Sequence, residues 1–114
     1  MIKSDTPFRR VMCDYKKHAR DKGHLFLLTD DEFKHLIGGN CFYCAAEPAN
    51  RKKSDAGKVL IYNGIDRLDS SIGYIKENCV TCCKPCNWMK KDMLLEEFLT
   101  RVRTIAARHP KAPI

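Results

Sequence analysis

Apolar residues follow a helical period near both ends of the chain. In the N-terminal segment they recur at three- and four-residue steps, which predicts an amphipathic helix that ends near Gly23. The apolar positions of this helix are Phe8, Val11, Met12, Tyr15 and Ala19. A second periodic segment predicts a C-terminal helix whose apolar face packs as core against the rest of the chain. Its apolar positions are Leu94, Leu95, Phe98, Leu99, Val102, Ile105 and Ala106.

Shorter elements are expected between these two helices. The segment from His24 to Leu28 predicts a short strand. Thr29 to Glu32 form a capping box, in which the Thr29 hydroxyl accepts from the Glu32 amide and the Glu32 carboxylate reaches back. A second helix should therefore run from about Asp30 to Ile37, where two glycines stop it. Residues 47–58 carry Pro, Gly and a charged run, which predicts an exposed loop.

Composition limits the classes of protein to which the chain can belong. With 114 residues, it is long enough for one domain but short for a core that is stable unaided. It has an odd number of cysteines, 7, and no apolar signal-peptide core after Met1, so we expect a reducing cytoplasm. No apolar run is long enough to span a membrane. The formal charge of +7 favours a polyanionic partner, and nucleic acid is the commonest one.

Two Cys-x-x-Cys pairs predict a structural zinc site. The first pair is Cys41 and Cys44, and the second is Cys83 and Cys86. Two such pairs that meet at one tetrahedral ion are typical of a four-thiolate site, in which metal binding contributes to folding. The sequence 79–82 is also Cys-x-x-Cys, but two cysteines within one strand are badly placed to chelate together. We therefore expect Cys13, Cys79 and Cys82 to be small buried apolar residues.

The segment 62–87 combines these cysteines with polar residues in a recognisable order. Asp66 and Arg67 follow Asn63 and Gly64, a Gly-Tyr dipeptide comes at 73–74, and Asn78 precedes a second strand. This order resembles the HNH, or ββα-metal, endonuclease family, and in particular its phage-type branch with a flanking zinc knuckle. The resemblance implies an α+β fold, a small zinc-stabilised ββα-metal domain with flanking N- and C-terminal helices. It also implies a location in the cytoplasm of a bacterial cell or a phage-infected host.

The domain limits follow from this interpretation. We expect a single domain over residues 1–114, with a basic helical region at 1–40. The zinc knuckle and the ββα-metal core would occupy residues 41–92, and the C-terminal helix residues 93–109.

The resemblance also implies which residues form the site. Asp66 and Asn87 would hold one hard catalytic ion, Mg²⁺ or Mn²⁺, through oxygen atoms. Asn78 would brace the hairpin and orient the catalytic residue, although an Asn that bonds its own turn explains it equally well. No histidine of the chain has the spacing of a ligand or a base, and Trp88 is expected to pack on the C-terminal helix rather than stack on a base.

Arg67 stands where the family usually has the histidine that acts as general base. A guanidinium stays protonated and cannot take a proton from water, so we expect Arg67 to stabilise charge on the phosphate. In family members with the same Asp-Arg pair, a tyrosine is the suggested base, and here it would be Tyr74. The cations beside it would lower its pKa from about 10. Tyr62 is a competitor, and either tyrosine could instead fill the small core.

The sequence therefore predicts a metal-dependent DNA endonuclease that hydrolyses phosphodiester bonds. The residues expected to contact nucleic acid are Arg51, Lys52, Lys53, Lys90 and Lys91. A homodimer on double-stranded DNA is one open arrangement. The alternative function is a catalytically inactive zinc module of the same origin that binds DNA or a protein, and a zinc-ribbon adaptor ranks last because it leaves residues 63–69 unexplained.

Overall fold

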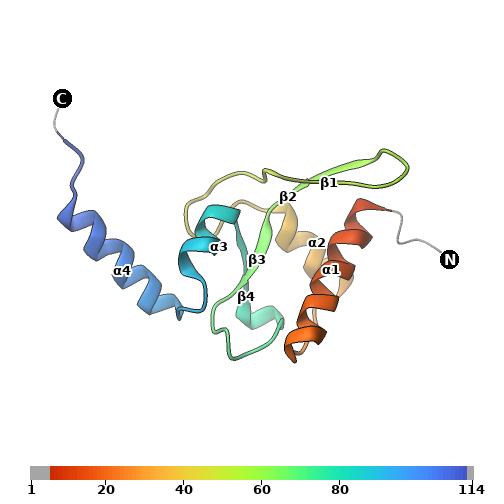
Figure 1. The fold of residues 1–114 in the computed structure, drawn as a ribbon, viewed down its shortest axis with the longest axis horizontal. Helices are drawn as coiled ribbons and strands as arrows, with labels where there is room; N and C mark the ends of the chain where they lie inside the picture. Colours follow the sequence, from red (N-terminus) through yellow and green to blue (C-terminus); the bar gives the residue numbers. More distant parts are fainter. Residues whose placement is uncertain (1–5, 113–114) are drawn as a thin grey trace.

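Two α-helices, two hairpins and two further α-helices follow one another along the chain (Figure 1). The computed structural model describes residues 6–112. Over these residues it contains four α-helices, one short 3-10 helix and two separate two-stranded antiparallel sheets. The predicted α+β class is confirmed.

The first two helices begin and end where local sequence signals place them. Helix α1 spans Pro7–Lys22 and ends at Gly23, whose φ of 76° is in the left-handed region that glycine adopts without strain. Helix α2 spans Asp30–Gly38. The Glu32 amide donates to the Thr29 hydroxyl at 3.1 Å and the Thr29 amide donates to the Glu32 carboxylate at 2.9 Å, so the predicted capping box is confirmed.

The expected strand from His24 to Leu28 is wrong. This segment makes only an isolated bridge, in which the Leu27 amide donates to the Tyr74 carbonyl and the Tyr74 amide donates to the Leu25 carbonyl. Gly73 allows this approach, because a Cβ there would lie 2.6 Å from the Leu25 carbonyl oxygen. The bridge ties the segment between α1 and α2 to the loop that connects the two strands of the second hairpin.

The expected loop at 47–58 is also wrong, because much of it belongs to a hairpin. Strand β1 spans Asn50–Lys53 and pairs with β2, Val59–Tyr62, in the register Arg51 to Ile61 and Lys53 to Val59. Exposure alternates along both strands. The charged run hid this alternation, because the residues on both faces of β1 are polar.

Ion pairs hold the hairpin β1–β2 against α1. The Lys52 ammonium lies 3.0 Å from the carboxylate of Asp14, and Arg10 lies 2.7 Å from the carboxylate of Asp55 in the hairpin turn. Arg51 and Lys53 lie on the opposite, exposed face of β1. The hairpin therefore turns one face to the helix and the other to solvent.

A second hairpin and a short helix form a ββα unit. Strand β3, Gly64–Arg67, pairs with β4, Cys79–Cys82, and α3 follows directly at Lys84–Lys90. The 3-10 helix η1, Lys76–Asn78, leads into β4. Three of the four residues of β3 are buried, which fixes the strand between its neighbours.

Buried residues from α1, α2 and β3 form the core beside this unit. Phe33 is fully buried at its centre and contacts the rings of Phe8, Tyr15 and Phe26 edge-on or tilted. The Ile65 amide of β3 donates to the Tyr15 hydroxyl at 3.0 Å, so α1 is tied directly to the strand that carries Asp66 and Arg67.

The C-terminal helix does not pack as the sequence predicts. Helix α4, Leu95–Arg108, extends away from the other elements (Figure 1). Phe98 is its buried residue and contacts the Tyr43 ring at 5.2 Å, whereas Val102 and Ile105 are 40% and 55% exposed. The expectation that this apolar face forms core against the site is therefore wrong beyond the first turn of the helix.

The described part of the chain contains no helix that combines the length and the apolar character needed to cross a lipid bilayer. The expected single domain over residues 1–114 stays a prediction, and residues 1–5 and 113–114 lie outside the described part.

Candidate functional site

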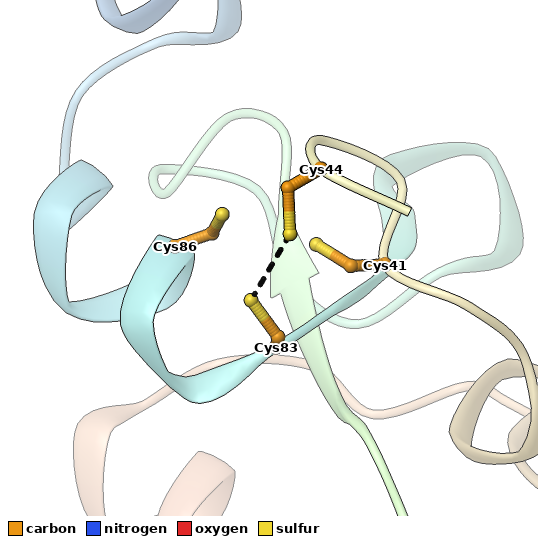
Figure 2. A group of neighbouring side chains, drawn as sticks. All are labelled: Cys41, Cys44, Cys83 and Cys86. Carbon is orange, nitrogen blue, oxygen red and sulfur yellow. Dashed lines mark hydrogen bonds between the residues drawn. The ribbon is translucent and has the colours of Figure 1, made fainter. Parts of the chain in front are cut away.

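Four cysteine sulfurs meet between the turn after α2 and the start of α3. Cys41 and Cys44 come from the turn, Cys83 and Cys86 from the start of the helix, and the thiols point toward one another (Figure 2). All four Sγ atoms lie within 4.8 Å of one another, and those of Cys44 and Cys83 are 3.6 Å apart. The predicted grouping of these four residues is confirmed.

The chemistry of this cluster fits zinc. Four sulfurs at such spacing can surround a tetrahedral ion at Zn–S distances of about 2.3 Å. Burial raises the pKa of the Cys83 and Cys86 thiols. At Cys41 burial also raises the pKa, but hydrogen bonds from the backbone at Cys83, Cys44 and Tyr43 outweigh it and lower the pKa to about 7. A bound zinc ion would itself deprotonate the coordinating thiols. The thiolate is the form that binds metal. The cluster could therefore hold a structural zinc ion at the base of α3.

The remaining cysteines lie outside this cluster. Cys79 and Cys82 are buried, as predicted, and burial raises the pKa of both thiols. Cys13 is exposed on α1, so the expectation that it is buried is wrong. It occupies a polar position of the helix next to the apolar stripe that contains Met12.

A cavity of about 630 Å³ lies between α1, β3 and the end of α3. Asp66, Arg67, Tyr74 and Asn87 all line it, together with Lys91 just after the helix. The fold thus brings together four residues that the sequence places in a catalytic site, although they are spread over 22 positions. The roles that the sequence assigns to them stay predictions.

Asp66 is buried and its carboxylate has two side-chain partners. The Tyr43 hydroxyl donates to Oδ2 at 2.7 Å. The Lys90 ammonium lies 3.2 Å from Oδ2 and 3.5 Å from Oδ1, and it also donates to the Arg67 carbonyl at 3.1 Å. Oδ1 has the longer contact and is the oxygen better placed to bind a further cation. Oxygen atoms of Asp66 and Asn87 in one cavity are the donors that a hard divalent ion prefers.

Lys90 itself is a correction to the sequence prediction. We expected it to contact phosphate at the surface, but its side chain is fully buried beside Asp66. A buried ammonium is stable only when it is paired and hydrogen-bonded. Lys90 therefore neutralises Asp66 and is not available to nucleic acid, whereas Lys91 is exposed at the cavity.

The Arg67 guanidinium is held by its own loop. Nη1 donates to the carbonyl oxygens of Ser70 and Ile72, and the guanidinium carbon lies 5.2 Å from the centre of the Tyr74 ring. Nε and Nη2 carry three further N–H groups. Arg67 lines the cavity, so its guanidinium is held at the cavity wall by the loop.

Tyr74 lies in the cavity wall but belongs to the core. Its side chain is only 6% exposed, and burial raises its pKa, while the nearby Arg67 lowers it by less. The net direction is opposite to the one that a phenolate base needs. Tyr62, the competing tyrosine, is half-buried on β2 and packs against the core cluster rather than in the cavity wall.

Asn78 holds the loop that follows β3. Its side-chain oxygen accepts from the Asp69 amide at 3.0 Å, and its Nδ2 donates to the carbonyls of Asp69, Ile72 and Gly73 at 3.0–3.1 Å. Asn78 therefore fixes the same loop that holds Arg67, and it does so by bonding its own turn.

Two residues of the site escaped the sequence prediction. Tyr43 carries no motif beyond its place within the first Cys pair, and its hydroxyl reaches Asp66 only in the fold. His18 of α1 lines the cavity although it precedes Asp66 by 48 residues. Lys90 was assigned to nucleic acid rather than to the site, although a Lys one turn after Asn87 lies near the same face of α3.

Trp88 was expected to pack on the C-terminal helix. Instead it is 68% exposed on α3, and the Lys84 ammonium lies over its ring at 5.9 Å. That expectation is wrong, because α4 leaves the body of the protein rather than folding back across α3 (Figure 1).

Two known proteins are similar to this chain, and no family model matches it. An uncharacterized protein of Acanthamoeba polyphaga mimivirus is 41% identical over 92 residues, which are 81% of this chain and 16% of that protein. The chain thus spans less than two thirds of this relative. The rare-cutting HNH restriction endonuclease PacI superposes with a TM-score of 0.62 at 20% identity, over 89% of this chain and 78% of that one. The chain therefore shares its fold with an HNH restriction endonuclease.

Proposed function

We propose that the protein is a metal-dependent DNA endonuclease that hydrolyses phosphodiester bonds in the cavity between α1, β3 and α3. One observation carries the proposal. Asp66, Arg67 and Asn87 line a single cavity next to a four-cysteine cluster, in a chain that has the fold of an HNH restriction endonuclease. The neighbour is a restriction endonuclease, which supports DNA as the substrate and phosphodiester hydrolysis as the reaction, and the residues of the cavity suit that chemistry.

Asp66 and Asn87 would hold one divalent ion, Mg²⁺ or Mn²⁺. When bound, this ion supplies positive charge to the phosphate oxygens. Tyr43 keeps the Asp66 carboxylate in place through its hydroxyl at 2.7 Å. Zinc in the cysteine cluster would be structural, fixing the start of the helix that carries Asn87.

Arg67 would bind the scissile phosphate. Its Nη1 is held by two carbonyls, so the remaining N–H groups can donate to phosphate oxygens without further ordering of the side chain. Arg67 stabilises the negative charge that grows on the phosphate during attack by water. Tyr74 as the base that activates this water stays a prediction, and its raised pKa argues against it.

The outer face of the hairpin β1–β2 and the exposed Lys91 would contact the DNA backbone. Arg51 and Lys53 are exposed, while Lys52 is engaged with Asp14 and would contribute less. A place in the phage-type branch of the family and a homodimer on double-stranded DNA are further parts of this proposal.

The test is cleavage of supercoiled plasmid by zinc-loaded protein with Mg²⁺ or Mn²⁺. Asn87→Ala and Arg67→Gln should each lower the rate by about 100-fold or more, as expected for loss of a metal ligand or a charge-stabilising donor. Asp66→Asn is preferable to Asp66→Ala, because the amide oxygen still accepts from Tyr43. Variants purified in the same way exclude a contaminating nuclease. Equal cutting by wild type and Asn87→Ala would contradict the proposal.

One observation favours the second candidate, an inactive DNA-binding module. The Lys90 ammonium already neutralises Asp66 and would compete with a cation for it. On this hypothesis the wild type binds plasmid but does not cut it with either ion. Isothermal titration with Mn²⁺ separates the two candidates further. An endonuclease should bind Mn²⁺ at a site that Asn87→Ala removes, whereas an inactive module should show no such difference between wild type and variant.

A further inference from the structure

The proposed hydrolysis needs a group that takes a proton from the attacking water. Among the residues of the cavity, Arg67 cannot do so, and Asp66 and Asp14 are paired with Lys90 and Lys52. Tyr74 is buried. Tyr15 also lines the cavity, but burial raises its pKa. Asp92 is the remaining carboxylate of the cavity wall, and a carboxylate is ordinarily a weaker base than an imidazole.

His18 can accept the proton of the attacking water through its imidazole. It lies on α1, one turn after Asp14, and lines the cavity together with Arg67 and Tyr74. It also lines the adjoining hollow with Lys22 and His24, which opens from the same wall. His18 is exposed, so a proton that it accepts can leave to solvent. Histidine is the side chain that ordinarily changes charge between about pH 5 and 8, as a base for water at neutral pH must.

The core of the protein keeps α1 in place beside the strand that carries Arg67. The Tyr15 hydroxyl accepts from the Ile65 amide at 3.0 Å, and Tyr15 contacts the Tyr74 ring at 5.9 Å. His18 follows Tyr15 by three residues and so lies on the same side of the helix. Its position relative to Arg67 is therefore set by buried contacts rather than by a loop.

We propose that His18 is the general base of the proposed endonuclease, supplied by α1 in place of the residue at position 67; this rests on the proposed function. The water oxygen forms a bond to phosphorus while one water proton passes to the His18 imidazole. The bond from phosphorus to the leaving sugar oxygen breaks, and that oxygen takes a proton from solvent. The imidazolium then returns its proton to solvent, so the products are an alcohol and a phosphate monoester.

The experiment compares His18→Ala with wild type in plasmid cleavage. Loss of a general base should lower the rate by about 100-fold to 10,000-fold. His35→Ala is the matched control, because His35 is exposed on α2 and lies outside the cavity wall. DNA binding without added Mg²⁺, measured by fluorescence anisotropy, should be unchanged in both variants within about threefold, because a base contributes to the chemical step. Added imidazole should restore part of the lost rate to His18→Ala and leave His35→Ala unaffected.

The pH profile gives a second readout. The wild-type rate should fall about tenfold per pH unit on the acid side, and His18→Ala should lose this dependence. Other charged or titratable groups face His18 and could shape the profile. These groups are Asp14, Tyr15, Lys22, His24, Asp66, Arg67, Tyr74, Lys91 and Asp92. His24→Ala is therefore measured alongside and should keep the acid limb.

The outcomes separate this proposal from the proposed function. A wild type that never cuts with Mg²⁺ or Mn²⁺ overturns the endonuclease and the base with it. A wild type that cuts while His18→Ala cuts equally well overturns only the base. A His18→Ala variant that is slow but insensitive to imidazole and keeps the acid limb also overturns it. If Tyr74→Phe alone abolishes cutting and remains folded, the phenol is the base instead.

Discussion

The two hairpins of this protein have strands of the same length and the same antiparallel pairing but opposite environments. In β1–β2 exposed residues alternate with half-buried ones, and ion pairs to α1 hold the hairpin in place. In β3–β4 most residues are buried or half-buried between α1, α2 and the cysteine cluster. The packing around the buried hairpin fixes the positions of Asp66 and Arg67. The exposed hairpin presents positively charged side chains to solvent. The buried hairpin thus holds the site residues rigidly, and the exposed hairpin presents accessible positive charge, although the strands of both have the same length.

The largest expected effect comes from the cysteine cluster that supports the buried hairpin. Cys86→Ser should unfold β3–β4 and α3, because structural zinc contributes on the order of 10 kcal/mol in small domains, comparable with the whole stability of a small protein, about 5–15 kcal/mol. Thermal unfolding followed by circular dichroism measures the loss of stability, and metal analysis measures the loss of bound zinc. Cys13→Ser, at an exposed thiol, is the control. A Cys86→Ser protein that melts like wild type would show that the cluster is not structural.

Asn78→Ala should have the next largest effect. It removes the hydrogen bonds to the loop at 69–73 and leaves three carbonyls with fewer donors, at a cost of about 3 kcal/mol. The loop that holds Arg67 should loosen with it, so cleavage should fall more than DNA binding. Chemical denaturation gives the free energy of unfolding, with Asn40→Ala at an exposed position as control. If Asn78→Ala lowered the free energy of unfolding no more than Asn40→Ala does, the loop would be held by other contacts.

Gly64→Ala tests how tightly the buried hairpin packs on α1. A Cβ at this position would lie 2.8 Å from the Tyr15 hydroxyl and 3.4 Å from the Cys82 carbonyl. Tyr15 must move away from Ile65, which should cost about 1–3 kcal/mol. Gly38→Ala on α2 has open space around the new methyl group and should instead stabilise the helix by about 0.5–1 kcal/mol. The comparison fails if both variants change the melting temperature in the same direction.

Substitutions in the exposed hairpin should affect DNA binding rather than stability. Arg51→Ala and Lys53→Ala should change the free energy of unfolding by no more than about 0.5 kcal/mol. Each should weaken DNA binding and lower the dependence of log affinity on log salt by about 1. Lys52→Ala, whose ammonium is paired with Asp14, should weaken it less. Binding titrations over a series of KCl concentrations measure this. Equal effects at all three positions would indicate that β1 is not oriented on DNA as proposed.

Part of this structure could be predicted from the sequence because it depends on local interactions. The capping box of α2, the end of α1 at Gly23 and the two Cys pairs depend on residues a few positions apart. The order of polar residues around Asp66 also predicted the fold. Strand β1 could not be read, because Arg51, Lys52 and Lys53 hide the alternation that partial burial imposes.

The remaining errors have one physical cause. Periodicity shows that a helix has an apolar face but not what covers it, so the exposure of α4 was missed. The burial of Lys90 and the approach of Tyr43 and His18 depend on contacts between distant segments. The residues with strong spacing signals were therefore found, and those that act through tertiary neighbours were not.

The projecting helix α4 has a consequence for local unfolding. From Thr100 to Arg108 its residues are exposed, and Phe98 anchors it to the body through Tyr43. A helix of this length is marginal on its own in water. Its outer amide groups should therefore exchange with deuterium far sooner than those of β3, and its arginines should be the first sites that trypsin cleaves. The terminal two turns would thus open and close many times while the buried hairpin stays intact.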